Sequence, residues 1–203
     1  MKQRKGKLFV VSAPSGAGKT TLCSRLLGNF GTVGYSVSFT TRKPRHDETD
    51  TEDYYFISVE EFEAMIERGE FLEWAKVHNN YYGTSRKTVE DILATGKDVL
   101  LDIDPKGARQ LKNSLDYGIY IFITAPSMED LKTRLINRRT ESEEIMNIRL
   151  TNALEEVQHI HEYDYLIVNK EINRAYNDLE AIYIAEHLRA ADVEKIEDIM
   201  DLN

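Results

Sequence analysis

The segment from residue 13 to residue 20 constrains the fold most strongly, because it joins an expected strand to an expected helix through a glycine-rich turn. Residues 8–13 form a compact β-branched and aromatic run, and residues 20–29 have apolar side chains at helical spacing. The connecting sequence is APSGAGK. In a strand, loop and helix of this kind, successive backbone N–H groups and the positive end of the helix surround a phosphate.

The connecting segment matches the P-loop pattern GxxxxGK followed by Ser or Thr, except that Ala13 stands at the first glycine. Gly16 and Gly18 let the backbone approach phosphate oxygens without an intervening Cβ. Lys19 is expected to bridge the β- and γ-phosphates of ATP, and the Thr20 hydroxyl is expected to ligate Mg²⁺. The alternative, an ordinary turn with an exposed lysine, is disfavoured by the flanking strand and helix. The residues expected to contact ATP here are Ala13, Pro14, Ser15, Gly16, Ala17, Gly18, Lys19, Thr20 and Thr21.

A second expected strand, residues 98–103, ends in acidic residues. Its carboxyl end delivers Asp102 and Asp104 to the edge where ligands bind in open α/β sheets. Asp102 is the natural candidate for a metal-side carboxylate, although a strand-end aspartate can also cap a helix. Asp104 directly precedes Pro105 and is therefore the better cap for the next helix, a role it can combine with contacting a substrate.

Hydrophobic periodicity predicts a regular alternation of strands and helices after residue 85, which is typical of a parallel α/β fold. Before that point, residues 35–39 are expected to form one half-buried strand, and residues 78–85 a turn. Further strands are expected at residues 54–57, 71–77, 119–125 and 165–168. Helices are expected at residues 58–69 and 85–95, after Pro105, after Ser127, and at residues 144–161 and 172–189.

Chain length and charge limit the class of protein. A chain of 203 residues can bury one substantial core, so we expect a single domain. Its net charge of −9 disfavours binding to nucleic acid or to anionic membranes, and no stretch approaches the roughly 18 apolar residues of a membrane span. Cys23 is the only cysteine, which we interpret as a small helix residue. Without an internal disulfide, a soluble, cytoplasmic protein is expected.

Five further blocks follow the P-loop in a fixed order. They are residues 38–45 (SFTTRKPR), Glu48 with Tyr54, residues 71–75 (FLEWA), residues 80–84 (NYYGT) and residues 101–104 (LDID). In order and spacing these blocks closely resemble the guanylate kinase family, and the resemblance covers about residues 8–188. It implies an enzyme that transfers the terminal phosphoryl group of ATP to GMP with the help of Mg²⁺. The partners it implies are ATP and GMP as substrates, with dGMP as a further candidate acceptor.

The resemblance also implies how the chain is organised. The fold it implies is α/β, with a three-layer P-loop core around a parallel sheet, an inserted GMP-binding subdomain and a small lid. The single domain, residues 1–203, then divides into a core of about residues 1–34, 86–130 and 150–190, a GMP-binding insertion of about residues 35–85, a lid of about residues 131–149, and a tail of residues 190–203.

Carried onto matching positions, the family's GMP ligands fall into two groups. The phosphate of GMP would be held by Arg42, Arg45, Tyr54 and Tyr82. The guanine would be read by Ser38, Glu73, Thr84 and Asp104. Arginine forks fit phosphate oxygens bidentately. A carboxylate can accept the adjacent N1–H and amine hydrogens of guanine.

The family's ATP-side ligands outside the P-loop also have matching positions. Arg134, Arg138 and Arg149 match the lid arginines, which come down on the ATP phosphates, and Asn169 matches a residue near the adenine. The catalytic set implied is Lys19, Arg42, Arg138 and Arg149, and the metal ligands are Thr20 and Asp102. Positioning and charge neutralisation suffice for in-line phosphoryl transfer, so no covalent nucleophile is needed.

The sequence departs from the family's pattern at five positions. Asp47 and Thr51 stand where glycines are usual in the loop after Arg45, so that loop is expected to be stiffer or differently shaped. Arg139 replaces a lid glycine. Lys106 replaces a common glutamine, and Lys170 a common aspartate. These changes bear on substrate affinity and lid motion more than on reaction type.

Two other functions remain open at this point. A non-catalytic guanylate-kinase-like module would bind protein partners in the GMP cleft, but such modules typically lose phosphate-binding residues that are present here. A related P-loop kinase would phosphorylate another small acceptor, which the guanine-reading set disfavours. Taken singly, each tyrosine, arginine or glutamate of the set is better explained by packing or a solvated surface, but together and in this order they favour the functional interpretation. Both a monomer and a homodimer are compatible with the sequence.

Overall fold

A five-stranded, wholly parallel sheet forms the centre of the fold in the computed structural model, which describes residues 6–46, 48–52, 54–77, 79–137 and 143–190. All five residues of its central strand are buried, as expected for a parallel strand covered on both faces. In spatial order the strands are β2 (Val33–Tyr35), β7 (Asp98–Asp102), β1 (Leu8–Ser12), β8 (Ile119–Thr124) and β9 (Tyr165–Val168).

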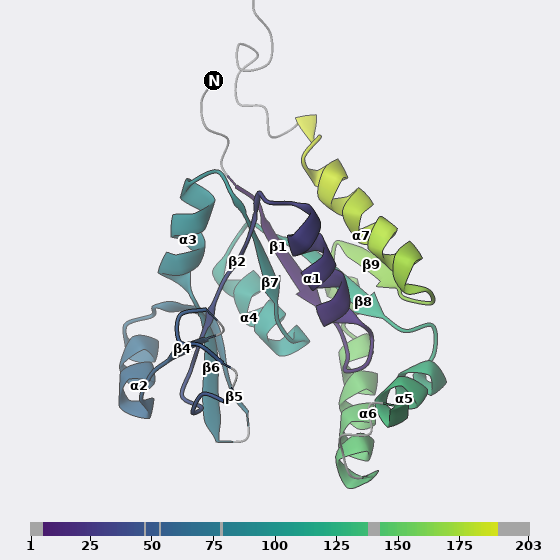
Figure 1. The fold of residues 1–203 in the computed structure, drawn as a ribbon, viewed down its shortest axis with the longest axis horizontal. Coiled ribbons are helices and arrows are strands. Elements are labelled where there is room, and N and C mark those ends of the chain that lie inside the picture. Colours follow the sequence, from purple (N-terminus) through teal and green to yellow (C-terminus); the bar gives the residue numbers. More distant parts are fainter. Residues whose placement is uncertain (1–5, 47, 53, 78, 138–142, 191–203) are drawn as a thin grey trace, which may run out of the picture.

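Helices cover both faces of this sheet, so the parallel α/β fold expected from the sequence is confirmed (Figure 1). On one face, α1 (Lys19–Asn29) and α7 (Ile172–Glu186) bury apolar side chains against β1 and β8. On the other face, α3 (Arg86–Ala94) and α4 (Pro105–Ser114) pack against β1 and β7. The expected caps form, because Ser85 accepts a hydrogen bond from the Thr88 N–H and Asp104 accepts one from the Gly107 N–H.

The segment between β2 and α3 forms a second, four-stranded sheet. Its strands, in spatial order, are β4 (Tyr54–Phe56), β3 (Ser38–Thr40), β6 (Asn80–Ser85) and β5 (Phe71–Val77). Helix α2 (Val59–Glu67) covers one face through a small core that contains Phe62, Met65 and Phe71. Figure 1 shows this sheet on one side of the carboxyl edge of the main sheet, opposite α5 (Met128–Asn137) and α6 (Glu143–Val157).

The structure corrects three expectations about single elements. Residues 78–85 are not a turn, because residues 80–85 form β6 and pair along their length with β5, leaving only Asn79, with φ of 68°, as the described turn residue. The single strand expected at residues 35–39 is two strands in different sheets, separated at Ser36 and Val37. The helix expected at residues 144–161 ends at Val157 and is followed by a short 3₁₀ turn, Ile160–Glu162.

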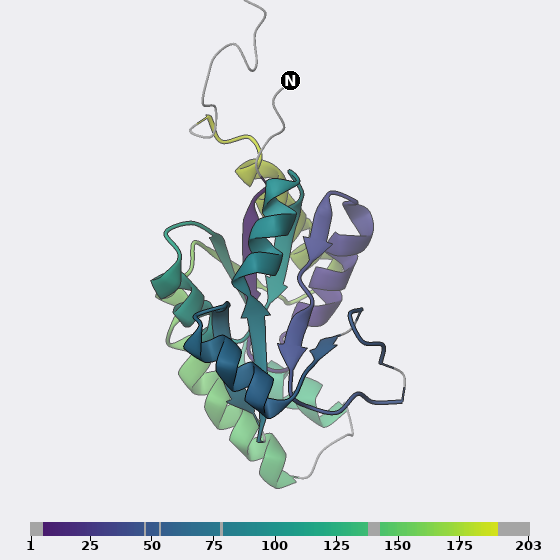
Figure 2. The ribbon, with the colours of Figure 1, turned by 90° about the vertical axis from the view of Figure 1, so that its left-hand side faces the viewer.

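The loop between β3 and β4 projects from the edge of the second sheet (Figure 2). Within it, Thr51 has a φ of 70°, in the left-handed region that disfavours a β-branched residue by about 1 kcal/mol or more. A hydrogen bond of 2.8 Å from the Thr51 N–H to the Tyr54 carbonyl accompanies this conformation. Thr51 therefore adopts a backbone conformation that suits glycine, the residue usual at this position in the family pattern. Asp47 lies outside the described residues.

Cys23 is buried in α1, as expected for a small helix residue. Burial, with a further contribution from Asp102, raises the pKa of its thiol to about 12. The thiolate is therefore scarce at neutral pH, and Cys23 is unsuited to act as a nucleophile. In the described part of the chain, none of the helices combines the length and the apolar character that crossing a bilayer requires.

A buried aspartate at the start of β7 connects the residues before β1 with the end of α7. Asp98, 4% exposed, accepts hydrogen bonds from the Lys7 N–H at 2.8 Å and from the Tyr183 hydroxyl at 2.7 Å. The Nε2 of His187 also lies 2.8 Å from its carboxylate. One carboxylate thus joins the start of β7 to the residues before β1 and to the end of α7.

We expect Asp98→Asn to lower the free energy of unfolding by about 2–4 kcal/mol, because the new amide turns a donor toward groups that are themselves donors. Urea denaturation followed by circular dichroism measures this change. Asp116→Asn, at an exposed position, is the matched control and should stay within about 0.5 kcal/mol of the wild type. Equal stability of the two variants would show that the Asp98 contacts contribute little.

Candidate active site

The P-loop lies between the end of β1 and the start of α1. Gly16 and Gly18 have φ values of 89° and 95°, which only glycine adopts readily. A Cβ on Gly18 would also lie 2.5 Å from the Nδ2 of Asn169, so this position has no room for a side chain. Thr20 and Thr21 are exposed in the first turn of α1, where free N–H groups point away from the helix. The loop thus presents backbone donors and hydroxyls at a positive helix end.

Lys19 is held against the end of β7. Its ammonium group forms an ion pair with Asp102 and donates a hydrogen bond of 2.9 Å to the Ile103 carbonyl. Both side chains are largely buried, with 18% and 16% exposed. The pairing of β1 with β7 brings these groups together, because Val11 and Asp102 are register partners. The structure therefore places the predicted lysine and the predicted metal-side carboxylate in direct contact.

The donor set at this point is compatible with Mg²⁺. Thr20 offers a hydroxyl and Asp102 a carboxylate, the hard oxygen ligands that this ion prefers. Among the described residues there is no group of three or more His, Cys, Asp or Glu side chains that could hold a metal. Mg²⁺ usually binds through one or two protein ligands plus water and phosphate oxygens, so a small protein set suits it.

Three of the residues predicted on the ATP side contact the P-loop or one another. Arg149, on α6, donates a hydrogen bond of 2.9 Å to the Ser15 hydroxyl. Asn169 is 3% exposed and donates from Nδ2 to the Ala17 carbonyl at 2.7 Å. Arg134, on α5, donates to the Asn169 carbonyl at 2.7 Å. Arg138 and Arg139 lie outside the described residues, so two of the three predicted lid arginines are placed.

The predicted phosphate ligands of the second sheet lie around one arginine. Arg42 forms a bidentate ion pair with Glu48, with N···O distances of 2.9 and 2.8 Å. Its guanidinium lies 5.4 Å from the centre of the Tyr54 ring, which in turn meets the Tyr82 ring edge-on at 6.1 Å. Arg45 is exposed, and its backbone N–H donates to Glu48 at 2.7 Å. Hydrogen bonding to Arg42 lowers the pKa of Glu48 to about 2.

Three of the four predicted guanine readers, Glu73, Thr84 and Asp104, lie around the start of α4. Glu73 is 8% exposed and accepts a hydrogen bond of 2.5 Å from the Thr84 hydroxyl. A Cβ on Gly107 would lie 2.9 Å from the Glu73 carboxylate and 3.4 Å from that of Asp104, so the two carboxylates converge there. Burial, with Asp104 adding to it, raises the pKa of Glu73. Ser38 is half-buried and pairs with Tyr54 across β3 and β4.

A local irregularity explains why Glu73 faces inward. The register of β5 against β6 shifts between Phe71 and Glu73, so Leu72 is an extra residue and Glu73 stands directly opposite Thr84. All three residues of this bulge are buried, which strict alternation would not allow. The bulge therefore turns a polar side chain toward α4, where it meets Thr84 and the backbone at Gly107.

Glu156 joins this site although sequence reasoning did not single it out. Burial raises the pKa of its carboxyl to about 7, with Asp104 adding to the shift and Lys19 and Lys106 opposing it. Glu156 follows Arg149 by two helical turns of α6, so the two residues share one helix face. That spacing is the signal that could have identified Glu156.

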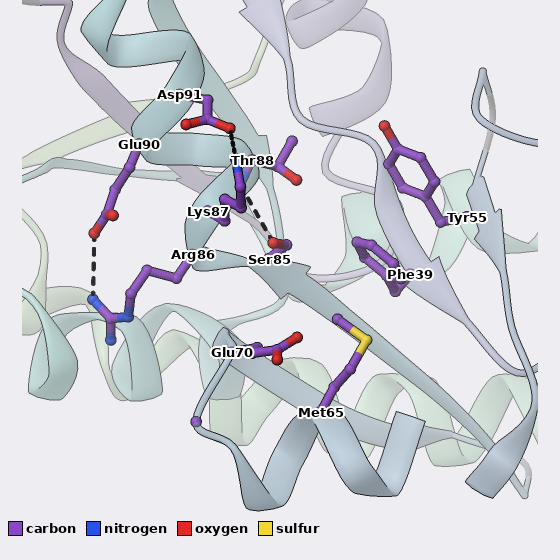
Figure 3. Close-up of a pocket in the computed structure, with 11 residues that line it drawn as sticks. Phe39, Tyr55, Met65, Glu70, Ser85, Arg86, Lys87, Thr88, Glu90 and Asp91 are labelled. Carbon is purple, nitrogen blue, oxygen red and sulfur yellow. Dashed lines mark hydrogen bonds and ion pairs between the residues drawn. The ribbon is translucent and has the colours of Figure 1, made fainter. Parts of the chain in front are cut away.

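A hollow of about 610 Å³ lies apart from these residues, between α2 and the start of α3 (Figure 3). Phe39, Tyr55 and Met65 line it together with Arg86 and Lys87. The two cations are paired with Glu90 and Asp91 on their own helix. None of the residues predicted to bind ATP, GMP or metal lines this hollow.

Comparison with known proteins supports this arrangement. The family model for guanylate kinase matches residues 5–186. The chain is 48% identical over 187 residues to the guanylate kinase of Geobacter metallireducens, covering 92% of each chain. It is 49% identical to that of Nitratidesulfovibrio vulgaris, covering 92% of this chain and 90% of the relative. The crystal structure of guanylate kinase from Anaplasma phagocytophilum matches with a TM-score of 0.76 and 34% identity, over 98% and 95% of the two chains.

The chain belongs to the guanylate kinase family. It is an enzyme, a nucleoside monophosphate kinase that binds nucleotides through a P-loop and transfers a phosphoryl group from ATP to GMP. The non-catalytic module considered above is not favoured, because these similar relatives are named as enzymes over nearly their full length. Of the departures from the family pattern, Lys106 is exposed on α4 and Lys170 directly follows the buried Asn169.

Proposed function

We propose that the residues described above carry out the transfer of the terminal phosphoryl group from ATP to GMP, each in the role that the family pattern implies. The proposal rests on the positions of Asp102 and Asp104 at the end of β7. Asp102 contacts the P-loop lysine, and Asp104, two residues later, converges with the buried Glu73 at Gly107. One strand end therefore serves both an ATP phosphate site and a site for a base that presents two adjacent donors.

The acceptor nucleotide binds against the second sheet in this proposal. Glu73 accepts the hydrogen bonds of guanine N1–H and the 2-amino group, and Thr84 fixes the orientation of its carboxylate. Arg42 and Arg45 hold the phosphate of GMP, with the hydroxyls of Tyr54 and Tyr82 as neutral donors. Tyr54 and Tyr82 lie on strands, and Arg42 and Arg45 are tied to Glu48 in the loop after β3, so the attacking phosphate oxygen is aimed in a fixed direction.

The donor nucleotide binds along the P-loop and α6. The backbone N–H groups of residues 16–20 surround its phosphates, and Lys19 leaves Asp102 to neutralise the charge that develops on the transferred group. Arg149 and Arg134 approach the same phosphates from the lid, and Asn169 contacts the adenine. Thr20 and Asp102 would hold Mg²⁺, which supplies charge neutralisation on the β- and γ-phosphates.

The remaining proposals concern the surroundings of the enzyme. With a net charge of −9 and a single cysteine, we place it in the cytoplasm, without nucleic-acid or membrane partners. It acts as a monomer or a homodimer. GMP and dGMP are both candidate acceptors, because the assigned residues bind the base and the phosphate and none is assigned to the ribose.

A coupled ADP-release assay with ATP and GMP tests this function. We expect turnover in the range of about 1–100 per second with Mg²⁺, and a loss of at least about a hundredfold when the metal is chelated. Restoring Mg²⁺ should restore the rate, which separates metal removal from denaturation. ADP release that is independent of GMP would indicate an ATPase and contradict the proposal.

A further inference from the structure

The hydrogen bonds of Arg42 to its own loop use one edge of its guanidinium. A guanidinium has five N–H donors in a fixed plane. Nη1 donates to Glu48 Oε2 and to the Lys43 carbonyl, both at 2.9 Å. Nη2 donates to Glu48 Oε1 at 2.8 Å. Neither Glu48 nor the Lys43 carbonyl takes Nε–H or the second hydrogen of Nη2, which lie side by side and form the second bidentate edge of the group.

Two of the predicted phosphate ligands lie beside the Arg42 guanidinium. Tyr82 forms a side-chain hydrogen bond with it. The centre of the Tyr54 ring lies 5.4 Å from its carbon atom. Glu48 therefore holds the side of Arg42 that faces its own loop, and both tyrosines lie next to the same guanidinium.

Glu48 is itself fixed by the loop that contains it. Its Oε2 accepts a hydrogen bond of 2.7 Å from the Arg45 N–H, and its own N–H donates to the Arg45 carbonyl at 3.3 Å. Its side chain is 14% exposed and that of Arg42 is 18% exposed, so the pair is far less solvated than a typical surface ion pair. The carboxylate thus connects the side chain of Arg42 to the backbone of Arg45.

We propose that Glu48 is a positioning residue for the acceptor phosphate: it holds Arg42 so that only the Nε–Nη2 edge is offered to the anion. This inference rests on the proposed function, because it assumes that the anion is the phosphate of GMP. Without Glu48, the long arginine side chain would sample many rotamers, and ordering it would weaken binding of the phosphate. The residues assigned to the guanine base lie outside this loop, on β3, β5, β6 and at the start of α4, and their contacts would be unchanged.

The test compares a ligand that carries the phosphate with one that lacks it. We expect Glu48→Ala to raise the KM for GMP by at least about tenfold and the KM for ATP by less than about twofold. The inhibition constant of guanosine, measured in competition with GMP, should change by less than about twofold, because guanosine makes no contact with Arg42. Glu48→Gln keeps one acceptor oxygen and should give an intermediate KM for GMP. Glu52→Ala, an exposed glutamate of the same loop, is the matched control.

Each outcome separates the proposal from its alternatives. An equal loss of affinity for GMP and guanosine would show that Glu48 only maintains the loop or the subdomain, and would overturn the positioning role. Unchanged GMP kinetics in Glu48→Ala would overturn it as well. A wild-type enzyme that does not phosphorylate GMP would contradict the proposed function before any variant is compared, and the inference with it.

Discussion

Lys19→Ala is expected to lower kcat by about a thousandfold or more, equivalent to some 4 kcal/mol of transition-state stabilisation. The substitution removes the side-chain cation that the P-loop offers to the transferred phosphoryl group. It also leaves Asp102 without the ion pair seen in the structure. The remaining backbone donors of the P-loop still bind phosphate, so ATP affinity should fall much less than the rate. Steady-state kinetics at saturating ATP and GMP measure the effect.

Lys97→Ala is the matched control for this variant. Lys97 is exposed and precedes β7, at the edge of the sheet opposite to the P-loop. It should retain wild-type kcat, and both variants should keep the circular dichroism spectrum of the folded protein. Near-normal turnover in Lys19→Ala would contradict the assigned role of the P-loop lysine.

Glu73→Gln should lower kcat/KM for GMP by at least about a hundredfold, or some 2.7 kcal/mol. Glutamine replaces one acceptor oxygen with a donor, which then faces a donor of guanine in a site that excludes most water. The KM for ATP should remain nearly unchanged, because Glu73 lies on the second sheet. Glu67→Gln, an exposed glutamate of α2, serves as the control.

The pH dependence of the same reaction adds a second readout. Only the deprotonated carboxylate of Glu73 accepts both guanine hydrogens, and burial raises its pKa. As the pH falls, kcat/KM for GMP should therefore begin to decrease at a higher pH than an ordinary glutamate would cause. Glu73→Gln should lack that decrease. If kcat/KM of Glu73→Gln decreases at low pH as it does in the wild type, another group causes the decrease.

Local sequence patterns were sufficient for four of the five strands of the main sheet and for the P-loop. The run of buried residues in β1, the glycines at positive φ and the cap at Asp104 follow from short-range rules of backbone geometry and capping. The contact between Lys19 and Asp102 also follows, because adjacent parallel strands bring their carboxyl ends together.

Features that depend on pairing between distant segments were not predictable from those rules. The sequence of β6 contains an asparagine and a glycine, which locally favour a turn, yet pairing with β5 makes it a strand. The bulge at Leu72 that turns Glu73 inward is likewise a property of the strand pair. The proposed positioning role of Glu48 and the raised pKa of Glu156 depend on which groups the fold brings next to each carboxyl. A single sequence does not show this.

The most direct test of guanine recognition is kcat/KM of the wild-type enzyme for GMP and for AMP, measured with saturating ATP and Mg²⁺. AMP lacks the N1–H and the 2-amino group that Glu73 is proposed to bind, so the buried carboxylate would be left unpaired. We predict that AMP is a poorer acceptor than GMP by about 10⁴-fold. Equal use of GMP and AMP would contradict guanine recognition by Glu73 and leave only a nucleoside monophosphate kinase without base selectivity.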